Sequence, residues 1–488
     1  MRIRLNWLVL MMAAIALLAL TGCSGTGSSP TPSPYRDPDP TAAPNEWTWV
    51  SGSNIVNQQG SYGTLGTPAP GNVPEARQEA ATWIDAAGNL WLFGGAAAPV
   101  GGGCNQFDPL CWAGTNSFFN DLWKFSGNEW TWMGGSENTD QAGIYGVQGV
   151  PSPTNSPGAR YAASSWRDLS GNFWLFGGTG YDSAGNVGSL NDLWKYSGGQ
   201  WTWVGGSNVI NQPGTYGTLG TAAPGNFPGA RSNAVSATDA SGNFWLFGGV
   251  GCDSTINCGG ALNDLWEYSK GQWTWLSGTT VSYPAQPGVF GTEGTPAPGN
   301  HPGARYSASG WVDASGNLWI FGGIGYNLIY DNLAELNDLW KYSAGQWTWV
   351  SGYDNLIDQL GTYGTQGTAA PGNVPGSRDS GMSWTDANGN LWFFGGEGFG
   401  ETWQGAGPDF NDLWKFSGGE GTWVGGSGVG GELGTYGTLG VPAPGNVPGA
   451  RISAATWTDA HGNLWLFGGF CIEPGVMGYL NDLWEYQP

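Results

Sequence analysis

The most regular feature of the chain is a short apolar run that ends in two glycines and recurs six times. In each copy Trp is followed by Leu, Ile or Phe and then by Phe, so large apolar side chains fall on both faces of the predicted strand. Strands of this kind are typical of sheets that are covered on both sides. The copies begin at Trp91, Trp174, Trp245, Trp319, Trp392 and Trp465. The pattern therefore predicts similar sheets packed face to face.

Two further aromatic segments follow each apolar run. The first reads Asn-Asp-Leu-Trp, with another aromatic residue two positions later; the second reads Trp-Thr-Trp in four repeats and weakens to Gly421–Trp423 in the fifth. Another segment, which starts at an arginine, precedes each run and is joined to it by Asp-Ala-Ser-Gly-Asn or a relative, a turn of residues that tolerate positive φ. Each repeat thus predicts four short strands. The repeats cover about 77–134, 160–204, 231–276, 305–350, 378–424 and 451–488.

The sixth repeat has no Trp-Thr-Trp segment, but one stands ahead of the first repeat, at Glu46–Val50. This order predicts that Glu46–Val50 forms the fourth strand of the last repeat and that the sheets close into a ring. Closure leaves no unpaired sheet edge at the junction. An open array of repeats would instead need capping repeats.

The paired glycines, the later Trp and the four-strand unit resemble the kelch family over roughly Glu46 to Pro488. The resemblance implies an all-β fold, a six-bladed kelch-type β-propeller with the N-terminal strand closing the last blade. The repeats exceed the family's roughly 50 residues because an insertion such as Gly214–Arg231 recurs before each first strand. The best-known catalytic relatives, of the galactose oxidase type, hold copper with two histidines, tyrosines and a thioether-forming Cys. This chain has only His301 and His461, predicted at opposite ends of the ring, so we expect no cofactor and no metal site.

The N-terminus reads as an export signal. Arg2 and Arg4 precede an apolar run, Leu8–Leu20, that is too short for a stable membrane span. The run ends in Leu-Thr-Gly-Cys, which resembles a bacterial lipobox with Cys23 as the lipidated residue; the alternative is an ordinary signal peptide with a chance Cys. We expect a signal peptide over 1–22, a Ser/Thr/Pro-rich tether over 23–45 and the propeller over 46–488. The protein would then be lipid-anchored in the bacterial cell envelope, periplasmic or at the cell surface.

Because neighbouring strands alternate in direction, the long connections are predicted at one end of the ring and the short turns at the other. The irregular connections between second and third strands are the expected binding loops. They cover 96–118, 179–189, 250–261, 324–335, 397–409 and 470–479. Cys104 with Cys111, and Cys252 with Cys258, each fall within one such loop and are predicted to form disulfides, since neither pair has zinc-type spacing.

The chain carries 15 basic and 37 acidic residues, a net charge of −22, which argues against nucleic acid as a partner. One cation recurs at the start of each first strand, near the expected mouth of the central channel: Arg77, Arg160, Arg231, Arg305, Arg378 and Arg451. Six guanidinium groups around one opening could bind a carboxylate or sulfate. The alternative is six structural ion pairs with the aspartates of Asn-Asp-Leu-Trp: Asp121, Asp192, Asp264, Asp338, Asp412 and Asp482.

Of the 31 tryptophans, all but Trp7, Trp112 and Trp403 occupy recurring strand positions. Trp112 and Trp403, with Tyr181 and Tyr326 from neighbouring loops, are candidates for stacking on a ligand; alternatively they form small cores within the loops. We expect a non-catalytic binding scaffold that presents its long-loop face to a protein or a glycan. The alternative is a carbohydrate-active enzyme, which would bring several acids and an aromatic residue together at the channel mouth and perturb the pKa of its carboxylates.

Overall fold

The computed structural model describes residues 44–98, 117–282, 286–327, 332–353, 358–386, 388–402, 407–473 and 476–488. The chain divides into two compact units, Met1–Pro34 and Tyr35–Pro488, of which the first lies outside the described residues. Over the described ranges the second unit is all-β, with strands and turns but no helix. Accordingly, no described segment forms a helix long and apolar enough to cross a membrane.

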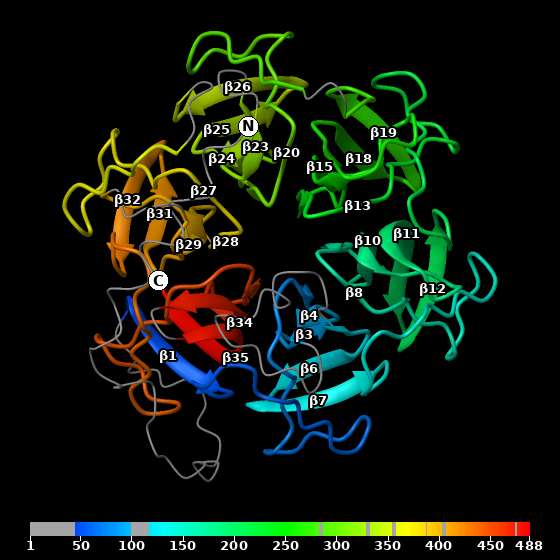
Figure 1. Cartoon of the computed structure of the whole chain (residues 1–488), viewed down its shortest axis with the longest axis horizontal. Helices are drawn as coiled ribbons and strands as arrows, with labels where there is room; N and C mark the ends of the chain where they lie inside the picture. Colours follow the sequence, from blue (N-terminus) through cyan, green and yellow to red (C-terminus); the bar gives the residue numbers. More distant parts are fainter. Residues whose placement is uncertain are drawn as a thin grey trace, which may run out of the picture. The chain divides into compact units, whose positions relative to one another are not determined.

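Antiparallel sheets of four main strands repeat along the described chain and stand around a common centre (Figure 1). The first sheet, from centre to periphery, contains β2 (Ala81–Ile84), β3 (Leu90–Phe93), β6 (Leu122–Ser126) and β7 (Glu129–Gly134). In the same order, the second sheet contains β9 (Ser164–Arg167), β10 (Phe173–Tyr181), β11 (Val187–Ser197) and β12 (Gln200–Gly205), and the third contains β14 (Val235–Thr238), β15 (Phe244–Phe247), β18 (Leu265–Ser269) and β19 (Gln272–Ser277). The fourth sheet contains β21 (Ser309–Val312), β22 (Leu318–Phe321), β25 (Leu339–Ser343) and β26 (Gln346–Ser351), and the fifth contains β28 (Met382–Thr385), β29 (Leu391–Phe394), β31 (Leu413–Ser417) and β32 (Glu420–Gly425). The last sheet contains β33 (Ala455–Thr458), β34 (Leu464–Glu473), β35 (Val476–Gln487) and β1 (Glu46–Ser51).

The two ends of this unit share one sheet. β1 pairs antiparallel with β35, and Trp47 lies opposite Tyr486 and Trp49 opposite Trp484. The innermost strands contact one another in sequence, β2 with β9, β9 with β14, β14 with β21, β21 with β28, β28 with β33, and β33 again with β2. The described strands therefore form a propeller-like arrangement in which each sheet has two neighbours.

Aromatic side chains fill the space between neighbouring sheets. The ring of Trp83 on β2 stacks on Phe173 of β10 at 5.3 Å, and its indole N–H donates to the carbonyl oxygen of Trp166 on β9 at 3.0 Å. The Trp of each Asn-Asp-Leu-Trp segment, for example Trp194 or Trp266, has no exposed surface. The second strand of each sheet carries apolar side chains on both faces, and it is buried because each face packs on a neighbouring sheet.

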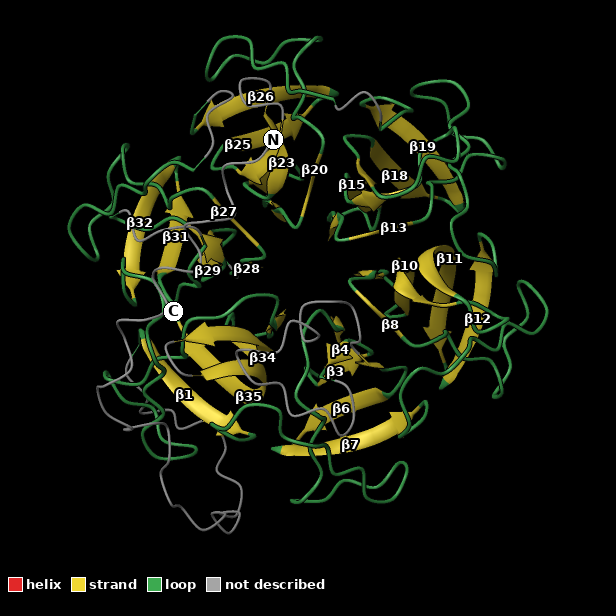
Figure 2. Cartoon of the chain, in the orientation of Figure 1, coloured by secondary structure: helices red, strands yellow, loops and turns green. Residues whose placement is uncertain are grey.

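The recurring insertions cover the outer edges of the sheets. In the first repeat the backbone N–H of Gly66 donates to the carbonyl of Trp132 on the outermost strand, and the side-chain amide of Asn72 donates to that of Trp130. The glycine bond recurs in every repeat, and the asparagine bond recurs in all but the fourth; in the sixth repeat they reach Trp49 and Trp47 of β1. In Figure 2 these green loops lie outside the outermost strands. The insertions thus satisfy backbone groups that would otherwise leave an open sheet edge.

The predicted first strand is not continuous. Arg305–Val312 divides into β20 (Arg305–Tyr306), which pairs with β23 (Ile324–Asn327), and β21, which pairs with β22. The break falls at Ser307, whose φ is +53°. Each repeat has a non-glycine residue with positive φ at this position: Glu79, Ala162, Asn233, Ser307, Ser380 and Ser453. An uninterrupted strand was therefore the wrong prediction, and the next section gives the reason.

Candidate functional site

The six residues with positive φ join in a ring of backbone hydrogen bonds around the centre. Each backbone N–H donates to the carbonyl oxygen of the equivalent residue in the preceding repeat, with N···O distances of 2.9 to 3.2 Å. The bonds run from Ser453 to Ser380, Ser380 to Ser307, Ser307 to Asn233, Asn233 to Ala162, Ala162 to Glu79, and Glu79 to Ser453. The positive φ turns each amide away from the first strand and toward the preceding repeat. The ring therefore explains the break in the first strand. It surrounds the axis between the long-loop end and the short-turn end.

The structure places the six predicted arginines inside their own repeats. Arg231 is 1% exposed, and its guanidinium forms a two-pronged ion pair with Asp264 at 2.7 and 2.8 Å. Its Nε and Nη1 also donate to the carbonyl oxygens of Gly229 and Gly248. Ion pairs between the same positions join Arg77–Asp121, Arg160–Asp192, Arg305–Asp338, Arg378–Asp412 and Arg451–Asp482. This geometry directs the guanidinium groups toward the aspartates of their own repeats, and none of the six arginines is more than 1% exposed.

A tyrosine that the sequence analysis missed completes five of the six networks. Tyr216, from the insertion, donates its hydroxyl to Asp264 at 2.7 Å, and the indole N–H of Trp266 donates to the same oxygen at 2.7 Å. Burial, together with the charge of Asp264, holds the pKa of Tyr216 well above its usual value. The recurring Gly-Thr-Tyr-Gly was the available signal. Phe290 stands at this position in the fourth repeat.

Carboxylates gather at the long-loop end of the axis. Burial raises the pKa of Glu79 to about 7, and it raises the pKa of Asp379 to about 7 with help from the charges of Glu397 and Glu335. Asp379 on β27 (Arg378–Asp379) lies directly opposite Glu397 on β30 (Glu397–Gly398), a placement that is unfavourable for like charges. Among the described residues, no lysine or arginine forms an ion pair with these four acids.

Aromatic rings occupy the other side of the same end. Phe118 packs on Tyr161 at 4.8 Å and on Tyr181 at 5.9 Å, and Phe470 packs on Tyr479 at 5.0 Å. Tyr161 follows the arginine of its repeat, as Asp379 follows Arg378, so the two side chains hold equivalent positions. Burial, and then the charge of Glu79, raises the pKa of Tyr161. This end therefore combines one buried carboxylate, Asp379, and three half-buried ones with aromatic rings. We call it the axial mouth: Glu79, Glu335, Asp379 and Glu397 with Phe118, Tyr161 and Tyr181.

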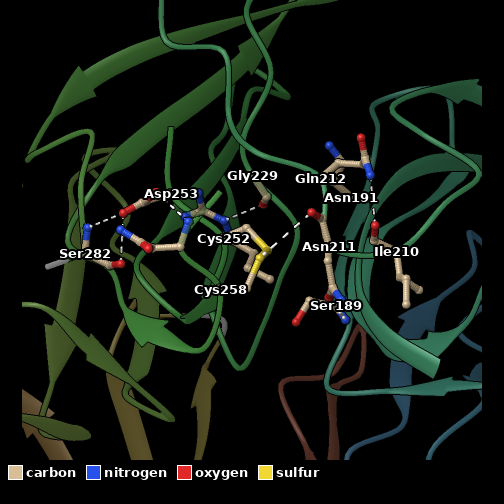
Figure 3. The surroundings of a disulfide bond; sticks show 12 residues. Ser189, Asn191, Ile210, Asn211, Gln212, Gly229, Cys252, Asp253, Cys258 and Ser282 are labelled. Carbon is tan, nitrogen blue, oxygen red and sulfur yellow. Dashed lines mark hydrogen bonds between the residues drawn. A yellow bond between two sulfur atoms is a disulfide. The ribbon is translucent and has the colours of Figure 1, made fainter. Parts of the chain in front are cut away.

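The other predicted site residues divide between described and undescribed parts of the chain. Tyr181 belongs to the aromatic side of the axial mouth, while Tyr326 lies on β23, opposite Leu333. Cys252 and Cys258 form a disulfide in a loop of the third repeat (Figure 3). The positions outside the described residues are Cys23, Cys104, Cys111, Trp112 and Trp403.

Hydrogen bonds order the disulfide loop beyond the S–S bond. Asp253, fully buried beside Cys252, accepts hydrogen bonds from the backbone amides of Thr255, Asn257 and Ser282. Cys471 is buried in the sixth repeat, with its Sγ 3.5 Å from the carbonyl oxygen of Gly478. Within the described ranges, no three His, Cys, Asp or Glu side chains are grouped so that they could hold a metal ion.

Comparisons with known proteins give distant structural likenesses only. No family model and no curated protein matches the chain. A fungal alcohol oxidase of the AA5 family, solved in complex with copper, is 13% identical with a TM-score of 0.43, over 88% of this chain and 77% of that chain. A protein of unknown function from Dyadobacter fermentans DSM 18053 is 9% identical with a TM-score of 0.45, over 92% of this chain and all of that chain. At these scores neither likeness carries an argument about activity.

Proposed function

We propose that this chain is a closed, six-bladed β-propeller of the kelch type that binds a glycan at the axial mouth. The closed ring is supported by the pairing of β1 with β35, by the contacts of β33 with β2, and by the backbone bond from Glu79 to Ser453. The kelch type is supported by the recurring Gly-Gly and Asn-Asp-Leu-Trp segments.

The observation that carries the binding proposal is the combination of aromatic rings and carboxylates at one end of the axis. Sugars present apolar C–H faces, which pack on rings such as that of Tyr161, and hydroxyl groups, which donate to carboxylates such as those of Asp379 and Glu397. Glu79 lies between these two sides, because it interacts electrostatically with both Tyr161 and Asp379. A protein ligand would instead need a broad contact surface of several hundred Å2.

The raised pKa values favour a second candidate, hydrolysis of a glycosidic bond at the same mouth. A carboxyl group with a pKa of about 7 still carries its proton near neutral pH and can act as a general acid. Protonated Glu79 would donate its proton to the leaving glycosidic oxygen, while an ionised neighbour, Glu397, would take a proton from the attacking water. The C–O bond to the leaving group breaks as the water oxygen bonds to the anomeric carbon.

We also propose the localisation of the protein, which is export and attachment to a bacterial membrane. The Leu20–Cys23 motif and the Ser/Thr/Pro-rich segment after it support export, lipidation of Cys23 and a tether to a bacterial membrane. Mass spectrometry of the N-terminal peptide from the native host would show a diacylglyceryl-modified Cys23. An unmodified N-terminus at another residue would contradict the lipid anchor.

A glycan array and a panel of chromogenic glycosides, applied to the whole mature chain, test both functions. We expect saturable glycan binding that falls at least about tenfold in Asp379→Asn and in Tyr161→Ala. Glu485→Gln is the matched control, because the pKa of Glu485 is also raised to about 7 but this carboxyl lies beside Asn463 at the short-turn end. Turnover that disappears in Glu79→Gln supports the enzyme; binding without turnover supports the scaffold, and silence in both assays overturns the glycan proposal.

A further inference from the structure

The third repeat lacks an aromatic residue that the other repeats carry near the axis. In five repeats the third residue of the innermost main strand is a tryptophan, but in the third repeat it is Ala237. On the adjacent strand β21, Gly310 stands where the other five repeats have Ser or Thr. The five tryptophans are Trp83, Trp166, Trp311, Trp384 and Trp457. Two small residues on neighbouring strands therefore leave space that larger side chains fill elsewhere.

A cavity of about 310 Å3 lies beside Ala237 and Gly310 at the short-turn end of the axis. Its volume is close to the lower limit of small-molecule sites. The last residues of four innermost strands line it, each directly before the Asp of a short turn: Thr238, Val312, Thr385 and Thr458. We call this cavity the turn-end vestibule.

One indole N–H in the lining has no acceptor. In four of the five repeats that carry the inner tryptophan, its indole N–H donates to a backbone carbonyl of the next sheet at 3.0 to 3.1 Å. Trp311, which lines the vestibule, instead stacks on Trp319 of its own sheet. Its indole N–H makes no hydrogen bond with the described residues, and Nε1 keeps some exposed surface. This donor is therefore available to a ligand.

Three hydroxyl groups of the lining are also without partners. Thr238, Thr385 and Thr458 are partly exposed, and their side-chain hydroxyls make no hydrogen bond with the described residues. A hydroxyl both donates and accepts, whereas an indole N–H only donates. All four groups stand on strands of the inner ring, so their positions are fixed before a ligand arrives.

The charges around the vestibule favour an uncharged ligand. Those described residues that line it carry no charge. The carboxylates that follow the lining residues are already bonded within their turns; Asp313, for example, accepts from the amide of Ser315 and from the indole of Trp319. Burial opposes ionisation, but these hydrogen bonds outweigh it and hold the pKa of Asp313 and of Asp386 below the usual value. Ionised carboxylates at the rim disfavour an anion, and their occupied oxygens offer little to a cation.

From this geometry we propose that the turn-end vestibule binds a small uncharged polyol, such as a monosaccharide, that accepts a hydrogen bond from Trp311 and exchanges hydrogen bonds with the three threonines. The site is separate from the axial mouth, because the ring of backbone hydrogen bonds through Glu79 and Ser453 surrounds the axis between the two ends. The inference therefore does not rest on the proposed glycan binding.

Isothermal titration calorimetry of the whole mature chain tests the proposal, with D-glucose and D-xylose as probes and D-glucuronate as the charged counterpart of glucose. We expect saturable binding of the uncharged sugars at one site. Binding of glucuronate should be at least about tenfold weaker than that of glucose, because no cation in the lining compensates the loss of water around its carboxylate.

Two variants change the vestibule itself. Trp311→Phe removes the unpaired N–H but keeps an aromatic ring, and it should weaken sugar binding about fivefold, as expected for one neutral hydrogen bond. Ala237→Trp introduces the residue that the other repeats carry, fills the cavity and should abolish binding. Thermal unfolding shows whether Ala237→Trp is folded, and Trp311→Phe decides the question if it is not.

Two controls separate this site from other effects. Trp166→Phe makes the same change at the equivalent position outside the vestibule; it should leave binding unchanged and lower the midpoint of thermal unfolding, because this indole donates to the carbonyl of Trp245. Asp379→Asn, at the axial mouth, should also leave binding unchanged. The assignment is overturned if neither sugar binds, if Trp311→Phe binds as tightly as the wild type, if either control loses binding equally, or if glucuronate binds as tightly as glucose.

Discussion

The Arg–Asp networks contain a natural exception that tests how they contribute to stability. In the third repeat Tyr216 donates its hydroxyl to Asp264, and its ring lies 4.9 Å from Trp266 and 5.3 Å from Trp275. In the fourth repeat the ring of Phe290 lies 4.9 Å from Trp340 and 5.3 Å from Trp349. The two rings are therefore held in the same way, and a hydroxyl added to Phe290 would point at Asp338.

The exchange of these two residues should have opposite effects on the free energy of unfolding. Tyr216→Phe removes a hydrogen bond to a buried carboxylate, for which we expect a loss of about 1.5–3 kcal/mol. Phe290→Tyr adds that bond to Asp338, whose carboxylate binds only Arg305 and Trp340 among the described residues, and we expect a gain of about 1 kcal/mol.

Urea denaturation of the whole chain, followed by tryptophan fluorescence, measures both effects as shifts of the transition midpoint. Tyr196→Phe is the matched control, because the hydroxyl of Tyr196 makes no hydrogen bond with the described residues. A neutral Tyr216→Phe, or a Phe290→Tyr that destabilises the chain, would refute the view that the tyrosine hydroxyl stabilises the buried carboxylate.

Three further perturbations follow from single contacts. Ser277→Ala removes the acceptor of the Trp347 indole N–H, 3.2 Å away, and should lower the free energy of unfolding in urea by about 1 kcal/mol. Ser351→Ala is the control and should leave it unchanged, because Gly421 stands where the corresponding Trp would be. Equal losses in the two variants would contradict this reasoning. Because the pKa of Glu79 is raised to about 7, the folded chain holds a proton that the unfolded chain releases, and the free energy of unfolding falls as pH rises from about 4.5 to 7. Glu79→Gln should reduce this fall. A variant whose free energy of unfolding has the same pH profile as that of the wild type would refute this expectation. Replacing Cys252 and Cys258 by Ala should cost no more than about 2 kcal/mol and leave the loop resistant to proteolysis, because Asp182 orders the equivalent loop of the second repeat without a disulfide.

The sequence alone determined the second, third and fourth strands of each repeat, their grouping in fours and the place of Glu46–Val50 beside the last repeat. These features depend on local order and on side chains that repeat along the chain, such as the Trp-Leu-Phe-Gly-Gly run and the Asp of each short turn. The equal numbers of recurring arginines and aspartates also offered ion pairs as an alternative to a ligand site, although the tyrosine that completes five of the six networks was missed.

Only the tertiary structure decided what lies near the axis. Glu79 and Ser453 are far apart in sequence and bond because the ring of sheets brings them together; no local pattern distinguishes their positive φ from an ordinary strand. The pKa of Asp379 is raised because the fold buries it opposite Glu397. Burial and cross-strand pairing depend on which residues the fold brings together, so the order of residue types along the chain does not show them.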